Sequence, residues 1–397
     1  MTALAALGEL AEFIRGVTFK PEQVTTADDI EAVACLRTKN VQAQLETADL
    51  VFVPRSVVKN EAQMVRRGDI VISSANSWPL VGKSSWVGEL DFEAAIGGFI
   101  CLLRVTRNDI DARYLYRWFS SPRTQAIVRS FGQKTTNISN LNLDRALGLA
   151  VPLPPLPEQR RIAAILDQAD ELRTKRRRAL GLFDELADSL FAEMSLSASA
   201  WEIVALGELT SIASGITKGR KVPDAPLRSV PYLTVANVQD KRLNLAVVKT
   251  IEASENEIDR YSLKPNDLLL TEGGDPDKLG RGTLWAGELS ECIHQNHVFR
   301  VRVADGRIHP VYLNWDLRSA RGRDYFLRSA KQTTGIASIN STQLKAFPVL
   351  VPALDVQTAF AARLGKLSEE RRRCEEGVAA ADELFASLQH RAFRGEL

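Results

Sequence analysis

The chain has 397 residues, of which 45% are hydrophobic and 25% charged, and its formal net charge is +2. This length is too great for one hydrophobic core and predicts two domains of ordinary size with connecting elements. The nearly balanced charge excludes a globally cationic protein, so any nucleic-acid partner must be bound by local basic surface.

Composition also gives expectations about the compartment. No apolar run reaches the length of a membrane span, and the first residues lack a charged segment followed by an apolar one. These features predict a cytoplasmic protein with no membrane partner. Four cysteines, Cys35, Cys101, Cys292 and Cys374, are too scattered for a disulfide framework or a zinc site, and we interpret them as ordinary thiols.

An internal duplication is the strongest pattern in the sequence. The segment Ala-Leu-Gly-Glu-Leu at residues 6–10 returns at 205–209, and Asp-Glu-Leu at 184–186 returns at 382–384. Further pairs fall in order between them: Gly16 and Gly215, Thr18 and Thr217, Trp86 and Trp285, Tyr114 and Tyr312, Thr135 and Thr333, Gln159 and Gln357. The repeat unit is half the chain, which indicates a duplicated molecule and not an array of small repeats.

Each half begins with a pattern typical of a mixed α+β domain. Residues 69–72, 98–103 and 230–235 are predicted strands, and residues 112–119 and 311–317 are predicted short helices. The apolar runs are irregularly spaced, without the regular alternation of strand and helix that a doubly wound sheet requires.

The composition changes abruptly at residue 151. Residues 151–157, Val-Pro-Leu-Pro-Pro-Leu-Pro, predict a stiff extended linker, because each proline restricts its own backbone and that of its predecessor. A long helix is predicted from Glu158 to about Met194, and a second one follows Val351 and Pro352. The predicted boundaries are 1–150 for the first α+β domain, 151–196 for the linker and first long helix, 197–350 for the second α+β domain and 351–397 for the second long helix.

Both long helices carry apolar residues at heptad spacing, which predicts that they pair with each other as a coiled coil. The predicted seam consists of Ile162, Ile165, Leu172, Arg176, Phe183, Leu186, Leu190, Phe360, Leu364, Leu367, Arg371, Val378, Phe385 and Leu388. Arg176 and Arg371 interrupt it, either to set the helix alignment or with their charges reaching solvent. Antiparallel pairing would make a rod of roughly 54 Å with one α+β domain at each end, related by a pseudo-twofold axis, and would place Met1 near Leu397.

Sequence motifs for catalysis and metal binding are weak. Residues 82–84, Gly-Lys-Ser, lack the preceding glycine of a phosphate-binding loop, and the second copy keeps neither Lys nor Ser. His294 and His297 have no third ligand cluster, which favours polar surface residues over a metal site. Methyltransferase, dinucleotide and hydrolase signatures are also missing, so the chain is predicted to be non-catalytic, with no metal or cofactor of its own.

Basic and amide side chains in glycine-rich loops are the remaining candidates for function. Such side chains read base edges or hold phosphates, although each one taken alone is more often a solvated loop residue. The predicted DNA-binding set is Asn76, Lys83, Gln133, Lys134, Thr135 and Thr136 in the first domain, with Lys218, Arg220, Lys221, Glu272, Lys278, Arg281, Gln295, His297, Gln332 and Thr333 in the second.

Three segments carry a resemblance to a known family. Residues 152–162 before the long helix, together with residues 231–238 and 267–274, resemble stretches of the specificity subunits of type I restriction-modification systems. The resemblance covers the whole chain, although the second linker, residues 351–357, lacks the proline run and the Glu-Gln pair.

The resemblance implies two target recognition domains, each reading one half of a bipartite site in double-stranded DNA. It also implies that the helices set the spacer and bind two methyltransferase subunits, and that restriction and translocase subunits complete the complex. S-adenosylmethionine, Mg²⁺ and ATP would then bind only to those partners. Two alternatives remain open from the residues alone: a coiled-coil adaptor that does not read DNA, and an enzyme with an unrecognised site.

Overall fold

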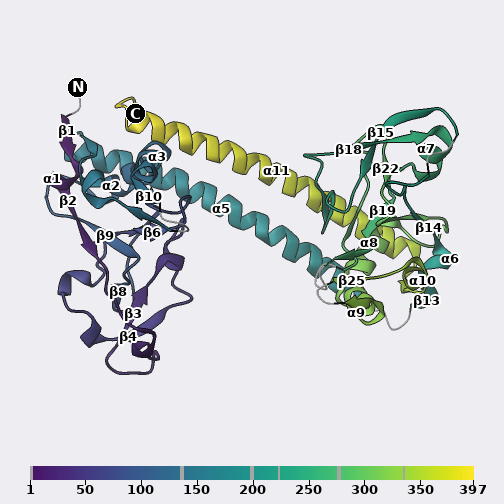
Figure 1. Cartoon of the computed structure of the whole chain (residues 1–397), viewed down its shortest axis with the longest axis horizontal. Coiled ribbons are helices and arrows are strands. Elements are labelled where there is room, and N and C mark those ends of the chain that lie inside the picture. Colours follow the sequence, from purple (N-terminus) through teal and green to yellow (C-terminus); the bar gives the residue numbers. More distant parts are fainter. Residues whose placement is uncertain (1–2, 135–137, 197–200, 222–223, 275–278, 334–335) are drawn as a thin grey trace. The chain divides into compact units, whose positions relative to one another are not determined.

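The computed structural model describes residues 3–134, 138–196, 201–221, 224–274, 279–333 and 336–397 (Figure 1). The chain divides into two compact units, residues 1–178 with 375–397 and residues 179–374. The division passes through the middle of two long helices, α5 (Leu156–Ser195) and α11 (Leu354–Ala392). Each unit therefore contains one α+β domain and half of each long helix.

The first domain precedes α5. Its strands are β1 (Ala3–Ala6), β2 (Ala11–Arg15), β3 (Ala32–Leu36), β4 (Val51–Pro54), β5 (Ile70–Ser73), β6 (Ala75–Asn76), β7 (Ser84–Trp86), β8 (Ala94–Ile96), β9 (Ile100–Val105), β10 (Gly132–Lys134), β11 (Ser139–Leu141) and β12 (Ala150–Leu153). Its α-helices are α1 (Leu7–Leu10), α2 (Ala112–Phe119), α3 (Pro122–Ser130) and α4 (Leu143–Leu147).

The second domain lies between α5 and α11 in the sequence. Its strands are β13 (Glu202–Ala205), β14 (Thr210–Ser214), β15 (Leu227–Leu233), β16 (Val238–Gln239), β17 (Arg242–Leu243), β18 (Lys249–Ser254), β19 (Leu268–Thr271), β20 (Gly273–Gly274), β21 (Gly282–Leu284), β22 (Ile293–His294), β23 (Val298–Val303), β24 (Lys331–Thr333), β25 (Ile336–Ser338) and β26 (Pro348–Val351). Its α-helices are α6 (Leu206–Leu209), α7 (Glu255–Tyr261), α8 (Pro310–Arg318), α9 (Ala320–Ser329) and α10 (Ser341–Lys345).

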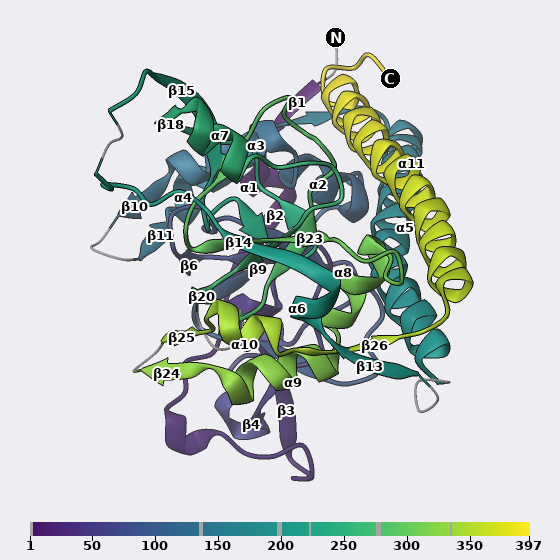
Figure 2. The same cartoon turned by 90° about the vertical axis from the view of Figure 1, so that its right-hand side faces the viewer.

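The two domains have the same sheet topology, which confirms the predicted α+β class and internal repeat. Antiparallel four-stranded sheets run in the orders β2-β9-β5-β7 and β14-β23-β19-β21 (Figure 2). Three-stranded sheets run β4-β3-β8 and β18-β15-β22, and small sheets run β6-β11-β10 and β20-β25-β24. The pairs β1-β12 and β13-β26 complete each copy, while the β16-β17 hairpin belongs to the second domain.

Each long helix is part of the hydrophobic core of its domain. In the first unit Ile162 and Leu166 of α5 and Phe385 of α11 pack in one cluster with Tyr114 and Phe119 of α2. In the second unit Phe360 and Leu364 of α11 pack with Tyr312, Phe326 and Phe347. The helices are therefore buried on one face by the domains as well as by each other, which stabilises them far more than helix propensity does.

The proline-rich segment is not the extended linker that its composition predicts. Residues 150–153 form β12, which pairs with β1 so that Leu4 faces Pro152, and α5 already begins at Leu156. Pro157 is tolerated there because the first N–H groups of a helix have no partner within it. The long helix therefore starts two residues earlier than predicted.

In α5 one of the two heptad series in the predicted seam, the one through Ile165, Leu172 and Leu186, is not the series that packs inward. Ile162 is buried, but Leu172 and Leu186 are 43% and 49% exposed. The inward positions lie one residue later, and they are Leu166, Arg173, Leu180 and Ala187. In α11 every predicted apolar seam residue, Phe360, Leu364, Leu367, Val378, Phe385 and Leu388, is buried or half-buried.

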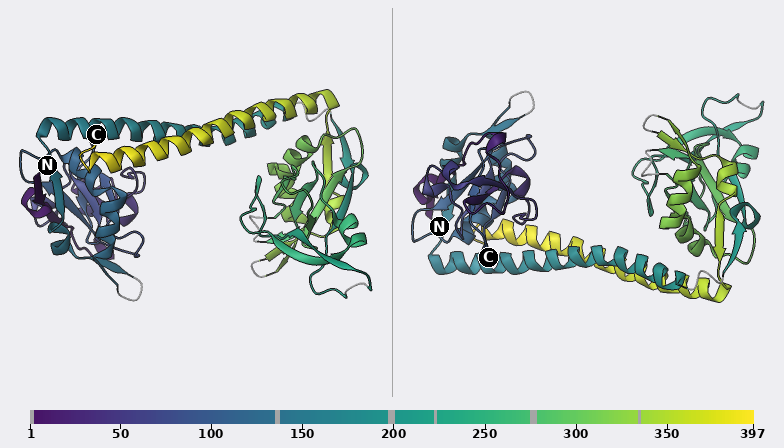
Figure 3. Two further views of the ribbon diagram at one scale, coloured as in Figure 1. Left: turned by 90° about the horizontal axis from the view of Figure 1, so that it is seen from above. Right: turned by 90° about the horizontal axis from the view of Figure 1, so that it is seen from below.

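The two helices run antiparallel within each unit (Figure 3). In the first unit Arg176 donates to the Gly377 carbonyl at 2.6 Å, and Arg177 pairs with Asp382 at 2.6 Å. In the second unit Arg371 pairs with Asp184 at 3.1 Å. Arg176 and Arg371 thus connect the helices instead of reaching only to solvent.

Both ends of the described chain contact the segment where α5 begins. β1 pairs with β12, and Arg161 donates to the Leu397 carbonyl at 2.7 Å. Met1, which the sequence predicts to lie near Leu397, is outside the described residues.

A buried glutamine joins each domain to its long helix. Gln159 is fully buried in the first turns of α5. Its side-chain carbonyl accepts from the Asp111 N–H at 2.8 Å, and its amide donates to the carbonyls of Asp109 at 2.9 Å and Pro154 at 2.8 Å. The side chain therefore ties the helix to the loop before α2 and to the strand before α5.

The second copy has the same clamp. Gln357 accepts from the His309 N–H at 2.7 Å and donates to the carbonyls of Arg307 at 2.8 Å and Pro352 at 2.7 Å. A tyrosine hydroxyl supports each clamp, Tyr114 donating to the Pro152 carbonyl and Tyr312 to the Leu350 carbonyl. Both pairs of residues belong to the sequence repeat.

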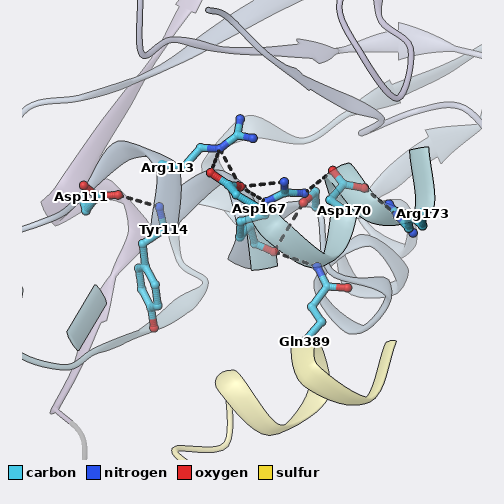
Figure 4. Close-up of polar contacts among 9 residues, drawn as sticks. Asp111, Arg113, Tyr114, Asp167, Asp170, Arg173 and Gln389 are labelled. Carbon is cyan, nitrogen blue, oxygen red and sulfur yellow. Dashed lines mark hydrogen bonds and ion pairs between the residues drawn. The ribbon is translucent and has the colours of Figure 1, made fainter. Parts of the chain in front are cut away.

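The rest of the contact between domain and helix differs in the two units. In the first unit the buried Arg117 pairs with Asp167 at 2.6 Å and Asp170 at 2.8 Å on α5, and Gln389 of α11 donates to the Arg117 carbonyl. Figure 4 shows Asp167, Asp170 and Gln389 at this contact. In the second unit Trp315, at the position of Arg117 in the repeat, lies 5.8 Å from the ring of Phe360. The repeat position at the centre of this contact is therefore a charged residue in the first domain and an aromatic one in the second.

We predict that Gln159→Leu destabilises the first unit. The substitution leaves one buried N–H and two buried carbonyls without partners, which should cost about 3 kcal/mol. For a unit of this size that corresponds to a melting temperature lower by roughly 6 to 12 °C, measured by thermal unfolding. Gln168→Leu, at an exposed position of the same helix, is the control and should unfold like the wild type. Equal melting of both variants would contradict the clamp.

Candidate nucleic-acid interface

A small sheet beside the main sheet collects many of the predicted DNA-binding positions in each domain. The chain leaves β5 and continues into β6, which pairs with the hairpin β10-β11. In the second domain it leaves β19 and continues into β20, which pairs with β25 of the hairpin β24-β25. Residues distant in the sequence are thereby brought to one edge of each domain.

In the second domain Glu272 and His297 form a pair at this edge. The Glu272 N–H donates to the His297 carbonyl at 3.0 Å. The His297 Nδ1 atom lies 2.6 Å from Glu272 Oε2, and the two side chains are 56% and 33% exposed. A hydrogen bond at this distance requires the proton on Nδ1. Both backbone and side chain therefore fix the histidine against the carboxylate.

The loop after β14 joins the same site. The Ile216 N–H donates to the His294 carbonyl at 2.8 Å, and the Asn296 N–H donates to the Ile216 carbonyl at 3.0 Å. Gly215 allows this approach, because a Cβ atom there would lie 1.8 Å from the His294 oxygen. The exposed Lys218 follows two residues after Ile216 on this loop.

Three further cations of the predicted set differ in availability. Arg220 is committed to an ion pair with Glu257 at 2.5 Å, and this hydrogen bond lowers the pKa of Glu257 to about 2. Lys221 is exposed. Arg281 is half-buried, and its side chain has no partner among the described residues, while its carbonyl accepts from Thr271 at 2.9 Å. Of these three cations, Arg220 is therefore the one that the described residues show paired within its own domain.

The predicted residues of the first domain lie mainly on the small sheet. Asn76 is on β6 opposite Ser139 and donates to Ser73 Oγ at 3.1 Å. Lys83 donates to Gln42, away from this sheet. Gln133 and Lys134 are on β10, and Gln332 and Thr333 occupy the corresponding strand β24 of the second domain. Thr135, Thr136 and Lys278 are outside the described residues.

Comparison with known proteins agrees with this architecture. A sequence model for the type I restriction modification DNA specificity domain matches residues 4–180. The StySPI type I restriction enzyme specificity subunit of Salmonella potsdam is 28% identical over an alignment covering 100% of this chain and 89% of the relative. The EcoKI specificity subunit of Escherichia coli is 27% identical, covering 99% and 89%. Over almost its whole length the chain is thus similar to specificity subunits of type I restriction-modification systems.

A solved specificity subunit also shares the fold. The crystal structure of the type I restriction-modification S subunit from M. genitalium aligns with a TM-score of 0.59 at 14% identity, covering 99% of this chain and 96% of that one. At this level of identity the similarity shows the fold alone.

The two domains of this chain carry different side chains on one backbone frame. The Ser74 N–H donates to the Phe99 carbonyl at 3.0 Å, as the Glu272 N–H does to the His297 carbonyl. The Leu141 N–H donates to the Ser74 carbonyl at 2.8 Å, as Ile339 does to Glu272 at 2.9 Å. Ser74 and Phe99 were absent from the predicted set, although their spacing from Glu272 and His297 matches the sequence repeat.

The interpretation of His294 as a polar surface residue is wrong. Its side chain is fully buried beside the ring of Tyr261, with Nδ1 2.7 Å from the Val298 carbonyl. Within the described residues no group of three or more His, Cys, Asp or Glu could hold a metal ion. The His294 side chain lies in the core, whereas the His297 side chain is exposed on the loop after the strand. The two rings are therefore in different environments and do not face a common site.

Three of the four cysteines are buried thiols. Burial raises the pKa of Cys35 to about 11 and those of Cys101 and Cys292 to about 12. The three buried thiols are therefore unreactive at neutral pH. Among the helices of the described segments, none is long and apolar enough for a transmembrane span.

We predict that His294 makes the second domain sensitive to acid. Burial lowers the pKa of His294 to about 4. Between about pH 6.5 and pH 4 the ring stays neutral in the folded domain but binds a proton in the unfolded chain, so protonation favours unfolding. The free energy of unfolding therefore has its full value above about pH 6.5 and falls by up to about 3 kcal/mol as the pH drops towards 4. Thermal unfolding at pH 7.5 and 4.5 should show a smaller loss for His294→Phe than for the wild type. His390→Phe, at an exposed position, is the control, and an equal loss in all three proteins would refute this role.

Proposed function

We propose that this chain is a non-catalytic DNA-reading subunit, in which each domain recognises one half of a bipartite target. The observation that carries the proposal is the repeated backbone frame with different side chains, half-buried Ser74 and exposed Phe99 in one copy, half-buried Glu272 and exposed His297 in the other. A shared frame would approach two half-sites in the same way, and unlike side chains would read different bases. A coiled-coil adaptor that does not read DNA would not need different side chains at these equivalent positions of its two domains.

The predicted DNA-binding residues support this reading. Lys218 and Lys221 are exposed on the loop beside the Glu272 and His297 pair, where they can neutralise phosphates. Asn76 lies on the small sheet of the first domain, and amide side chains read adenine edges. Phosphate contacts would position each domain, and the small-sheet edge would select the sequence.

The paired helices are proposed to set the spacer and to bind partners. Their buried and half-buried seam residues face inward, while Lys175, Arg178, Arg372 and Arg373 are exposed. We expect two methyltransferase subunits to bind the helical region and restriction subunits to join them. Adenine methylation and cleavage would be catalysed by those partners, which would also bind S-adenosylmethionine, Mg²⁺ and ATP.

We predict salt-dependent, sequence-specific DNA binding by the complex of this chain with its methyltransferase subunits. Replacing Lys218 and Lys221 with alanine should weaken binding to all duplexes and reduce the slope of log affinity against log salt by roughly 2, because two phosphate contacts are lost. Lys59→Ala with Lys366→Ala, two exposed positions elsewhere, should leave the slope unchanged. Absence of binding to any duplex by the wild-type complex would exclude the proposed function.

We also predict that the two domains read independently. Exchange of residues 1–150 for the corresponding domain of a relative should change one half of the methylated sequence and leave the other half unaltered. Methylome sequencing of a host carrying the complete system measures both halves at once. A change in both halves would show that the domains do not act as separate readers.

A further inference from the structure

We propose that Phe99 and the Glu272–His297 pair occupy one reading position in the two domains, where Phe99 contacts the 5-methyl group of thymine and Glu272 accepts a hydrogen bond from the N4 amino group of cytosine. This inference rests on the proposed function and specifies which base chemistry each domain recognises. It concerns Phe99, which no sequence motif indicated, and assigns distinct roles to Glu272 and His297.

The equivalence of the positions follows from the backbone. Phe99 and His297 each directly precede the central strand of a four-stranded sheet, β9 or β23. Each residue's carbonyl accepts from the residue that follows β5 or β19, Ser74 or Glu272. The Phe99 carbonyl accepts a second hydrogen bond, from the Ala75 N–H at 3.1 Å. The side chains at this position are therefore presented by a fixed frame in both domains.

The chemistry of the first domain at this position is apolar. Phe99 is 64% exposed, although its backbone is anchored between two sheets. Trp78, two residues after Asn76, is 46% exposed, and Ile138, next to the register partner of Asn76, is 44% exposed. Exposed apolar side chains gathered at one site indicate a binding surface. The thymine methyl group is the apolar feature of the major-groove edge, so thymine is the base that this surface fits.

The chemistry of the second domain is that of a hydrogen-bond acceptor. A carboxylate on a surface that faces DNA is repelled by phosphates, so Glu272 favours binding only where a base donates to it. His297 Nδ1 lies 2.6 Å from Oε2, which orients the carboxylate and leaves Oε1 for a base. Cytosine presents an N4 amino donor, whereas the adenine N6 donor lies beside the N7 acceptor, which would repel the second carboxylate oxygen. Cytosine is therefore the better match.

The test uses the complex with methyltransferase subunits and duplexes carrying its target, with each half-site assigned by the domain exchange. Replacing one thymine of the first half-site by uracil removes only the methyl group. At one thymine of the first half-site, this replacement should lower the affinity of the wild-type complex for the duplex several-fold. The complex with Phe99→Ala should bind the thymine and uracil duplexes equally. In the second half-site, N4-methylation of one cytosine should weaken wild-type binding by roughly tenfold or more but have little effect on Glu272→Gln combined with His297→Ala.

Specificity exchange provides a second measurement. The double variant Ser74→Glu with Phe99→His should change the preferred base at one position of the first half-site from thymine to cytosine, as read by methylome sequencing. Ile30→Ala and Val247→Ala, at positions 101% and 72% exposed, are matched controls that should keep the wild-type sequence. Thermal unfolding of each variant verifies that it is folded.

The outcomes separate this inference from the proposed function. If the wild-type complex shows no preference among duplexes, both fail. If it reads a bipartite target but no uracil or N4-methylcytosine substitution distinguishes the wild type from the variants, the proposed function stands and the assignment of Phe99 and Glu272 is overturned. A first half-site without thymine, or a second one without cytosine, overturns the corresponding assignment directly.

Discussion

The buried glutamine at the start of each long helix is the interaction on which the rest of the structure depends. Gln159 and Gln357 each satisfy three backbone groups that would otherwise be buried without partners. A leucine at either position could fill the space but could not satisfy those groups. These hydrogen bonds fix the direction in which a helix leaves its domain, and the helix direction decides which of its residues face the other helix.

Around this shared clamp the two copies have diverged in the chemistry of their contacts. Arg117 and two aspartates attach α5 to the first domain, whereas Trp315 and Phe360 attach α11 to the second. A buried ion pair is strongly destabilised when one partner is removed, and an aromatic cluster is sensitive to volume instead. The first domain therefore matches the aspartates on α5, and the second domain matches the aromatic ring on α11. The two domains have the same fold but different contacts with their helices.

Several elements were predictable because they depend on local pattern. The repeat, the helix over residues 112–119 and the seam of α11 all follow from spacing along the chain. The second register of α5 was not predictable, because the series through Ile165 and the series through Leu166 both have heptad spacing, and only packing in the core favours Leu166. His294 was misplaced because the sequence does not reveal which face of a two-residue strand is buried.

The sequence by itself determined the duplication, the family resemblance and the types of side chain available at each position, since these are properties of residue order. Only the tertiary structure decided which side chains share a site. Phe99 and Ser74 are 25 residues apart, as are His297 and Glu272, and pairing between strands brings each pair together. Arg220 has the right chemistry for phosphate but is neutralised by Glu257 from another element. Long-range pairing of this kind depends on the whole sheet and cannot be derived from local spacing.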